Sequence, residues 1–130
     1  MYIAIDLQSD VPIYEQLKQE IITGIAKKQL TPGEKLPSVR SMAADIGVNL
    51  HTVNKAYHQL RDDGYILIHR QRGVMIHPDG MPPADQDYVD TLKQSLHPFI
   101  AASICRGMSE QEFQHICLDI FAEFDSKKDV

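Results

Sequence analysis

The fold is decided by residues 36–65, which read LPSVRSMAADIGVNLHTVNKAYHQLRDDGY. Ser38 is placed to cap a first helix, and Gly47 follows that helix where a left-handed backbone costs glycine least. Asn49 is placed to cap a second helix. The apolar residues that recur at helical spacing are Val39, Met42, Ala43 and Ile46, then Val53, Ala56, Tyr57 and Leu60. The stretch therefore predicts two short helices joined by a tight turn, each with one buried side.

The opposite side of the second predicted helix is mostly polar and mildly basic. We call it the outer face, and its members are Leu50, His51, Thr52, Asn54, Lys55, His58, Gln59 and Arg61. A helix, a turn with glycine and a second helix with a polar face form a helix-turn-helix, whose second helix usually lies in the DNA major groove. Asn54 is able to pair with adenine, Lys55 with guanine or phosphate, and Leu50 to touch a thymine methyl group.

Residues 65–76 predict a β-hairpin with a basic tip. Two short β-rich runs, 65–68 and 74–76, flank a segment that reads HRQRG, in which Gly73 allows the backbone to turn. Arg70 and Arg72 are suited to contact phosphates or to enter the minor groove of DNA. An ordinary solvated turn is the alternative interpretation of the same residues.

Residues 11–77 resemble the winged helix-turn-helix of GntR-type bacterial transcription regulators. The matching positions are 12–14, 16–17, 30, 32–33, 36–40, 42–43, 47–49, 52–53, 56–57, 60, 64–66, 73 and 76. The short chain resembles the YtrA-like subgroup, in which a small two-helix tail replaces the large effector-binding or enzyme-like domain of other members. Three positions depart from the family pattern, which usually has glycine near Lys28 and Gln71 and arginine or proline near Leu50.

The resemblance implies an α+β fold that is mainly α. It places a winged helix-turn-helix DNA-binding domain in residues 1–77, a linker in 78–84 and a two-helix dimerisation hairpin in 85–126. The implied DNA-binding residues are Ser38, Arg40, Asn49, Leu50, His51, Thr52, Asn54, Lys55, Arg70, Gln71, Arg72 and Gly73. For Arg40 the alternative is a surface ion pair with Asp45 or Glu34.

Charge is distributed unevenly along the chain of 130 residues, whose net charge is −5. Residues 1–77 carry 9 basic and 8 acidic side chains, whereas residues 78–130 carry 4 and 10. The acidic excess therefore lies in the second part of the chain, away from the predicted helix-turn-helix. Local charge matters more for DNA binding than the charge of the whole chain, so the negative total does not exclude a nucleic-acid partner.

The first part of the chain predicts a strand followed by a helix. Residues 1–7 alternate between apolar and polar side chains, which is typical of a short strand. Asp10 is a candidate helix cap with Pro12 in the first turn, and the apolar spacing carries this helix to about Lys28. Residues 31–35, which read TPGEK, predict a turn.

The last part predicts a helical hairpin. Apolar spacing begins at about Asp85, Pro98 should kink or split the first helix, and Gly107 closes it. Ser109 and Glu112 form a capping-box pattern at the start of the last helix. Such a hairpin has too little core of its own, which predicts a two-fold dimer. The predicted interface residues are Leu92, Leu96, Phe99, Ile100, Phe113, Ile116, Ile120 and Phe121.

Other chemistry finds little support in the sequence. Two cysteines do not make a secreted disulfide framework, and His115 and Cys117 lie on different sides of a helix, which disfavours a metal site. The sequence shows no catalytic constellation, cofactor motif, signal peptide or membrane span. We therefore expect a cytoplasmic, homodimeric repressor that binds double-stranded DNA at an inverted repeat. The alternatives are a sensor of an unidentified small molecule or metal at the dimer interface and a module that binds protein.

Overall fold

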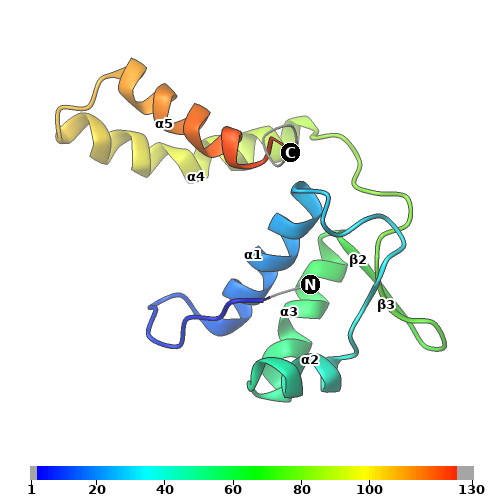
Figure 1. Ribbon diagram of the computed structural model, residues 1–130. Coiled ribbons are helices and arrows are strands. Elements are labelled where there is room, and N and C mark those ends of the chain that lie inside the picture. The colour runs from blue at the N-terminus through cyan, green and yellow to red at the C-terminus, as the bar shows by residue number, and fades with distance from the viewer. Residues whose placement is uncertain (1–2, 126–130) are drawn as a thin grey trace. The chain divides into compact units, whose positions relative to one another are not determined.

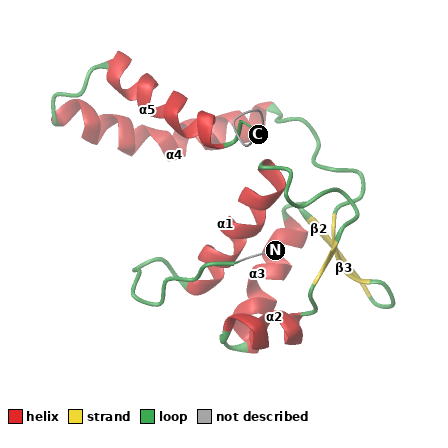
Figure 2. Cartoon of the chain, in the orientation of Figure 1, coloured by secondary structure: helices red, strands yellow, loops and turns green. Residues whose placement is uncertain are grey.

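The computed structural model describes residues 3–125, and it divides the chain into two units between Met81 and Pro82. We call the first unit the head and the second the tail. The head contains α1 (Ile13–Ala26), β1 (Lys35–Leu36), α2 (Val39–Ile46), α3 (Leu50–Asp62), β2 (Ile66–His69) and β3 (Gly73–Ile76), and the tail contains α4 (Gln86–Cys105) and α5 (Glu110–Glu123) (Figures 1 and 2). The predicted α+β, mainly α fold with two C-terminal helices is confirmed.

Helix α3 is the centre of the head. It packs against α1, α2 and β2, and Val53, Ala56, Tyr57 and Leu60 of its inward stripe are all fully buried. The hydroxyl of Tyr57 donates a hydrogen bond of 2.8 Å to the carbonyl oxygen of Pro37. Burial raises the pKa of the Tyr57 phenol well above its usual value, so this hydroxyl remains a donor. The bond ties the start of α2 to the core.

The local signals around the helix-turn-helix are confirmed. The Ser38 side chain accepts a hydrogen bond from the Ser41 backbone, and Asn49 accepts one from His51. Gly47 has φ 70°, a left-handed conformation, in the turn between α2 and α3. These three residues therefore fix where each helix begins and ends, as the sequence predicts.

A three-stranded antiparallel sheet with strand order β1-β3-β2 completes the head. Strands β2 and β3 form the predicted hairpin, which we call the wing, and His69 pairs with Gly73 at its tip. The predicted turn in residues 31–35 is confirmed by the hydrogen bond of 3.0 Å from the Glu34 amide to the Thr31 carbonyl oxygen. Strand β1, in which Lys35 and Leu36 pair with Met75 and Val74, was not predicted. Two residues are too few for an alternating pattern, so long-range pairing alone creates this strand.

The N-terminal segment differs from the predicted strand in the described residues 3–7, while residues 1 and 2 lie outside the description. No strand forms there, because main-chain groups of Asp6 bond to the Gln16 side chain, with distances of 2.8 and 2.9 Å. Asp10 does not cap α1, whose N-cap is Pro12 without a side-chain bond. The helix ends at Ala26, and Lys28 beyond it has φ 62°, the conformation that favours glycine.

The tail is a pair of well-capped helices without a core of its own. Pro98 does not split α4, which continues through it to Cys105. The predicted capping box of Ser109 and Glu112 is confirmed, and its backbone hydrogen bond holds the pKa of the Glu112 carboxyl below its usual value. Neither α4 nor α5 contains a buried residue. The helices are thus locally well specified, yet their apolar stripes remain exposed.

Candidate nucleic-acid interface

The N-terminal half of the outer face of α3 is available to a ligand. Leu50 and His51 are exposed, and Thr52 and Asn54 are partly exposed. No side-chain hydrogen bond or ion pair joins His51, Thr52 or Asn54 to another residue in the range 3–125. Hydrogen-bonding groups in the first two turns of α3 therefore remain free for an external partner.

The other half of the outer face is engaged within the head. Gln59 accepts a hydrogen bond of 2.8 Å from Lys18 of α1, and Arg61 binds Asp62 at 3.1 Å. The Lys55 ammonium lies 3.9 Å from the ring centroid of Tyr14, a cation–π contact. The sequence placed these residues on one polar face but did not reveal their partners, because those on α1 are about 40 residues away along the chain.

Arg40 lies at the second position of α2, next to the cap provided by Ser38. Its side chain is exposed and forms no ion pair with Asp45, Glu34 or any other described residue. The predicted alternative of a surface ion pair is therefore wrong. A free guanidinium beside a helix N-terminus is well suited to bind phosphate or a guanine edge.

The wing presents its basic tip to solvent. Arg70, Gln71 and Arg72 are exposed, and Gly73 has φ 81° where the chain enters β3. The imidazole Nδ1 of His69 accepts hydrogen bonds from the backbone N–H groups of Gln71 and Arg72, each 3.1 Å long. Sequence reasoning missed this role of His69, although a side-chain acceptor two residues before a turn amide was a usable signal.

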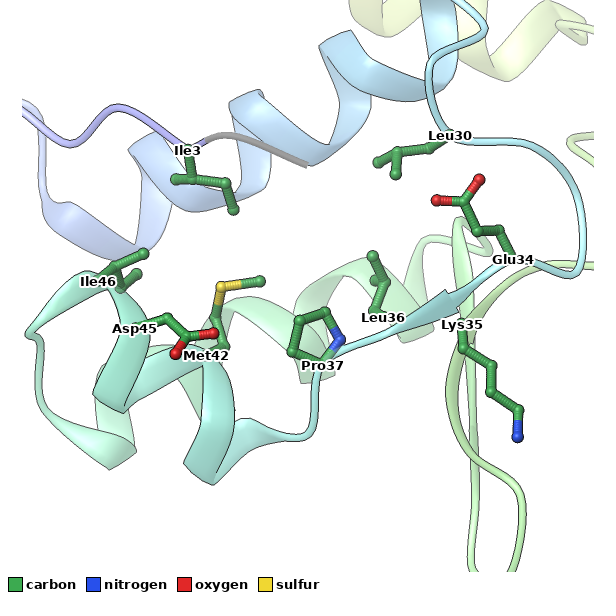
Figure 3. A pocket seen from close by; sticks show the side chains of 9 residues that line it. All are labelled: Ile3, Leu30, Glu34, Lys35, Leu36, Pro37, Met42, Asp45 and Ile46. Carbon is green, nitrogen blue, oxygen red and sulfur yellow. The ribbon is translucent and has the colours of Figure 1, made fainter.

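A cavity of about 520 Å³ lies in the head beside the helix-turn-helix (Figure 3). Figure 3 shows Ile3, Leu30, Leu36, Met42 and Ile46 directed toward it from the N-terminal segment, the turn after α1, β1 and α2. Glu34 and Asp45 also line it, whereas the Lys35 ammonium points away. The lining is therefore an apolar floor with two carboxylates, which favours a cation over an anion.

The family assignment comes from comparison with known proteins. The model of the family described as bacterial regulatory proteins, gntR family, matches residues 13–76. The repressor YtrA of Bacillus subtilis (strain 168) is 32% identical, over 97% of this chain and 97% of its own. The chain belongs to the GntR family. It is a transcription regulator with a DNA-binding winged helix-turn-helix, and it is similar to the YtrA-like members.

Two solved structures relate this GntR-family chain to other regulators. YtrA from Sulfolobus acidocaldarius is 39% identical, covers 78% of this chain and 99% of its own, and gives a TM-score of 0.64. The DNA-binding domain of AraR in complex with operator ORX1 is 25% identical, covers 58% of this chain and 98% of its own, and gives a TM-score of 0.53. The match to AraR is thus a match to a domain that holds an operator.

Within residues 3–125, no three His, Cys, Asp or Glu side chains are grouped so that they would hold a metal ion. Cys105 and Cys117 are both free thiols. None of the helices described is both long and apolar enough to cross a bilayer.

Proposed function

We propose that this GntR-family protein is a transcription repressor that binds an inverted-repeat operator as a homodimer in the cytoplasm. Helix α3 enters the major groove and the wing follows the adjacent minor groove. The predicted set of twelve DNA-binding residues supplies the contacts, and neither a cofactor nor an enzymatic step takes part. The repressor name of the B. subtilis relative and the operator held by AraR support this proposal.

The observation that carries the proposal is the set of unengaged donors in the head. These donors come from α2, α3 and the wing, and their side chains have no hydrogen bond or ion pair among the described residues. They belong to Arg40, His51, Thr52, Asn54, Arg70 and Arg72. A surface that offers several donors without internal partners is able to exchange water for phosphate and base edges. Asn49 and Ser38 contribute their remaining hydrogen-bonding groups after capping.

The dimer part of the proposal rests on the tail. Phe99 is 68% exposed and Phe121 is 75% exposed, and the other predicted interface residues are at best partly buried. Such an apolar surface on a two-helix hairpin calls for a partner, and an identical hairpin provides one with the same distribution of apolar side chains. Two heads then present two α3 helices, which matches a two-fold symmetric operator.

Selection of bound sequences from a random pool of duplex DNA tests the proposal directly. We expect enrichment of an inverted repeat whose half-site centres lie about one helical turn apart, roughly 10 base pairs, or a multiple of that spacing. Steep loss of affinity with salt should accompany binding. A pool that shows no enriched sequence after several rounds, with a folded dimer, would contradict the proposal.

We expect Arg40→Ala and Thr52→Ala each to weaken binding to the selected operator by about 1–3 kcal/mol. Both side chains lie where phosphate and base edges approach, and neither stabilises the fold through a hydrogen bond of its own to described residues. Fluorescence anisotropy titration measures the change, with thermal unfolding to check the fold. Arg61→Ala is the matched control, because Asp62 already binds that arginine. An unchanged affinity for both test variants would refute the assignment.

Small-molecule sensing is the second candidate function, and the cavity in Figure 3 is the observation that favours it. This cavity borders α2, so a ligand there would act on the helix-turn-helix itself. Its carboxylates favour a small organic cation with an apolar body. Calorimetry with amines of increasing chain length, with and without operator DNA, separates the two candidates. Heat of binding with altered DNA affinity would support sensing, whereas no heat from any amine would exclude this class of effector.

A further inference from the structure

His69 occupies an unusual place at the tip of the wing. It is the last residue of β2 and pairs with Gly73, so only Arg70, Gln71 and Arg72 form the connecting loop. The ladder between β2 and β3 ends at the 69–73 pair, so the N–H groups of Gln71 and Arg72 have no strand partner. Both point at the His69 ring, where Nδ1 accepts them at 3.1 Å each.

This geometry determines which nitrogen of the neutral imidazole carries the proton. A nitrogen that accepts hydrogen bonds carries no proton, so the neutral ring must hold its proton on Nε2. Nδ1 then closes a small ring of atoms with the backbone, as the oxygen of an Asn or Asp side chain does in an Asx-turn. The loop has no glycine between its two arginines, so it does not contain the residue that most easily adopts a tight-turn backbone conformation. The Nδ1 acceptor of His69 holds the loop backbone in place instead.

We propose that His69 is the positioning residue of the wing, which holds Arg70 and Arg72 in the orientation that meets DNA. The two arginines flank Gln71, and the bonded amides belong to Gln71 and Arg72, so the imidazole fixes the backbone between the two charged side chains. Their guanidinium groups remain free of ion pairs among the described residues. His69 itself need not touch DNA, and its effect on DNA binding rests on the proposed function.

Holding the loop in one conformation lowers the cost of binding. A three-residue loop with two long arginine side chains loses conformational freedom when it contacts phosphates. The His69 bonds restrict the backbone part of that freedom before DNA arrives. One or two hydrogen bonds of this kind change an equilibrium constant by about tenfold. We therefore expect a change of this size both in the equilibrium between the ordered and open loop and in the affinity for DNA.

Two substitutions of His69 separate the acceptor from the ring. His69→Phe keeps a planar ring on the strand but removes the acceptor, while His69→Asn keeps an acceptor able to form an Asx-turn. In the full-length protein without DNA, we expect the amides of Gln71 and Arg72 to exchange with solvent about tenfold faster in His69→Phe, and close to the wild-type rate in His69→Asn. Two-bond proton–nitrogen correlation spectra of the wild type should show the Nε2–H form of His69.

DNA binding is measured with a labelled duplex of about 30 base pairs that carries the selected operator, which spans about three helical turns. We expect about tenfold weaker binding for His69→Phe and recovery in His69→Asn. Unchanged amide exchange in His69→Phe would overturn the positioning role without reference to DNA. Faster exchange with unchanged affinity would overturn its contribution to recognition, while Arg70→Ala and Arg72→Ala test independently whether the wing contacts DNA at all.

Discussion

Phe99→Asp is expected to convert the protein to a monomer at micromolar concentration and to weaken binding to an inverted-repeat operator by about 100- to 10,000-fold. Phe99 lies on α4 with 68% of its surface exposed, and a phenyl ring of this kind contributes strongly to an interface. A carboxylate in its place would be buried without a partner in the dimer. The loss of affinity follows because a monomer presents one head, and the second half-site no longer binds within the same complex.

Leu118→Asp is the matched control for this experiment. Leu118 lies on α5 and is 64% exposed, but it is not among the predicted interface residues. Sedimentation velocity should therefore show a dimer for Leu118→Asp and a monomer for Phe99→Asp. A dimer in both variants would refute the predicted interface, and a monomer in the wild type at the same concentration would refute the dimer itself.

Tyr57→Ala is expected to lower the free energy of unfolding by about 3–5 kcal/mol, the range found for removal of a large buried ring. Tyr57 is fully buried in α3, and its hydroxyl holds Pro37 at the start of α2. Its loss would leave a cavity in the core of the head and free the start of α2 from its anchor on α3. Urea unfolding of the full-length protein, followed by circular dichroism at fixed protein concentration, measures this change.

Tyr57→Phe separates the ring from the hydroxyl. It keeps the packing and removes only the 2.8 Å bond to Pro37, so we expect a loss of about 0.5–1.5 kcal/mol. Equal losses for both substitutions would show that the hydroxyl, rather than the ring, carries the stability. A small loss for Tyr57→Ala would contradict the view that α3 is the centre of the head.

The parts of the structure that sequence predicted well depend on interactions within a few residues. The confirmed helix-end signals all act between residues that are close in the chain. They are the caps at Ser38 and Asn49, the left-handed Gly47 and the capping box at Ser109. The side chain that forms such a bond and the amide it meets appear in one short motif. For this reason the bounds of α2, α3 and α5 were predictable without any knowledge of tertiary contacts.

The parts that sequence missed depend on contacts between distant residues. Strand β1 exists because Lys35 meets Met75, and Lys55 rests on Tyr14 of another helix. Neither contact leaves a periodic signal in the chain. The His69 bonds are local, yet they were missed because histidine is a less common turn acceptor than asparagine or aspartate. The predicted DNA-binding and dimer-interface residues stay predictions until the variants above are measured.

The two ends of α3 differ in what they offer to a ligand. Near its C-terminal end, Gln59 and Arg61 already have internal partners, and the carboxylates of Asp62 and Asp63 follow. Its first turns offer free donors and the positive end of the helix dipole, whereas at its last turn the Arg61–Asp62 pair leaves the Asp63 carboxylate as the excess negative charge. A phosphate chain would be attracted at one end and repelled at the other. In the proposed two-fold dimer this holds for each head separately: each head would approach its half-site with the start of α3 leading before any base pair is distinguished, which shortens the search for the correct register.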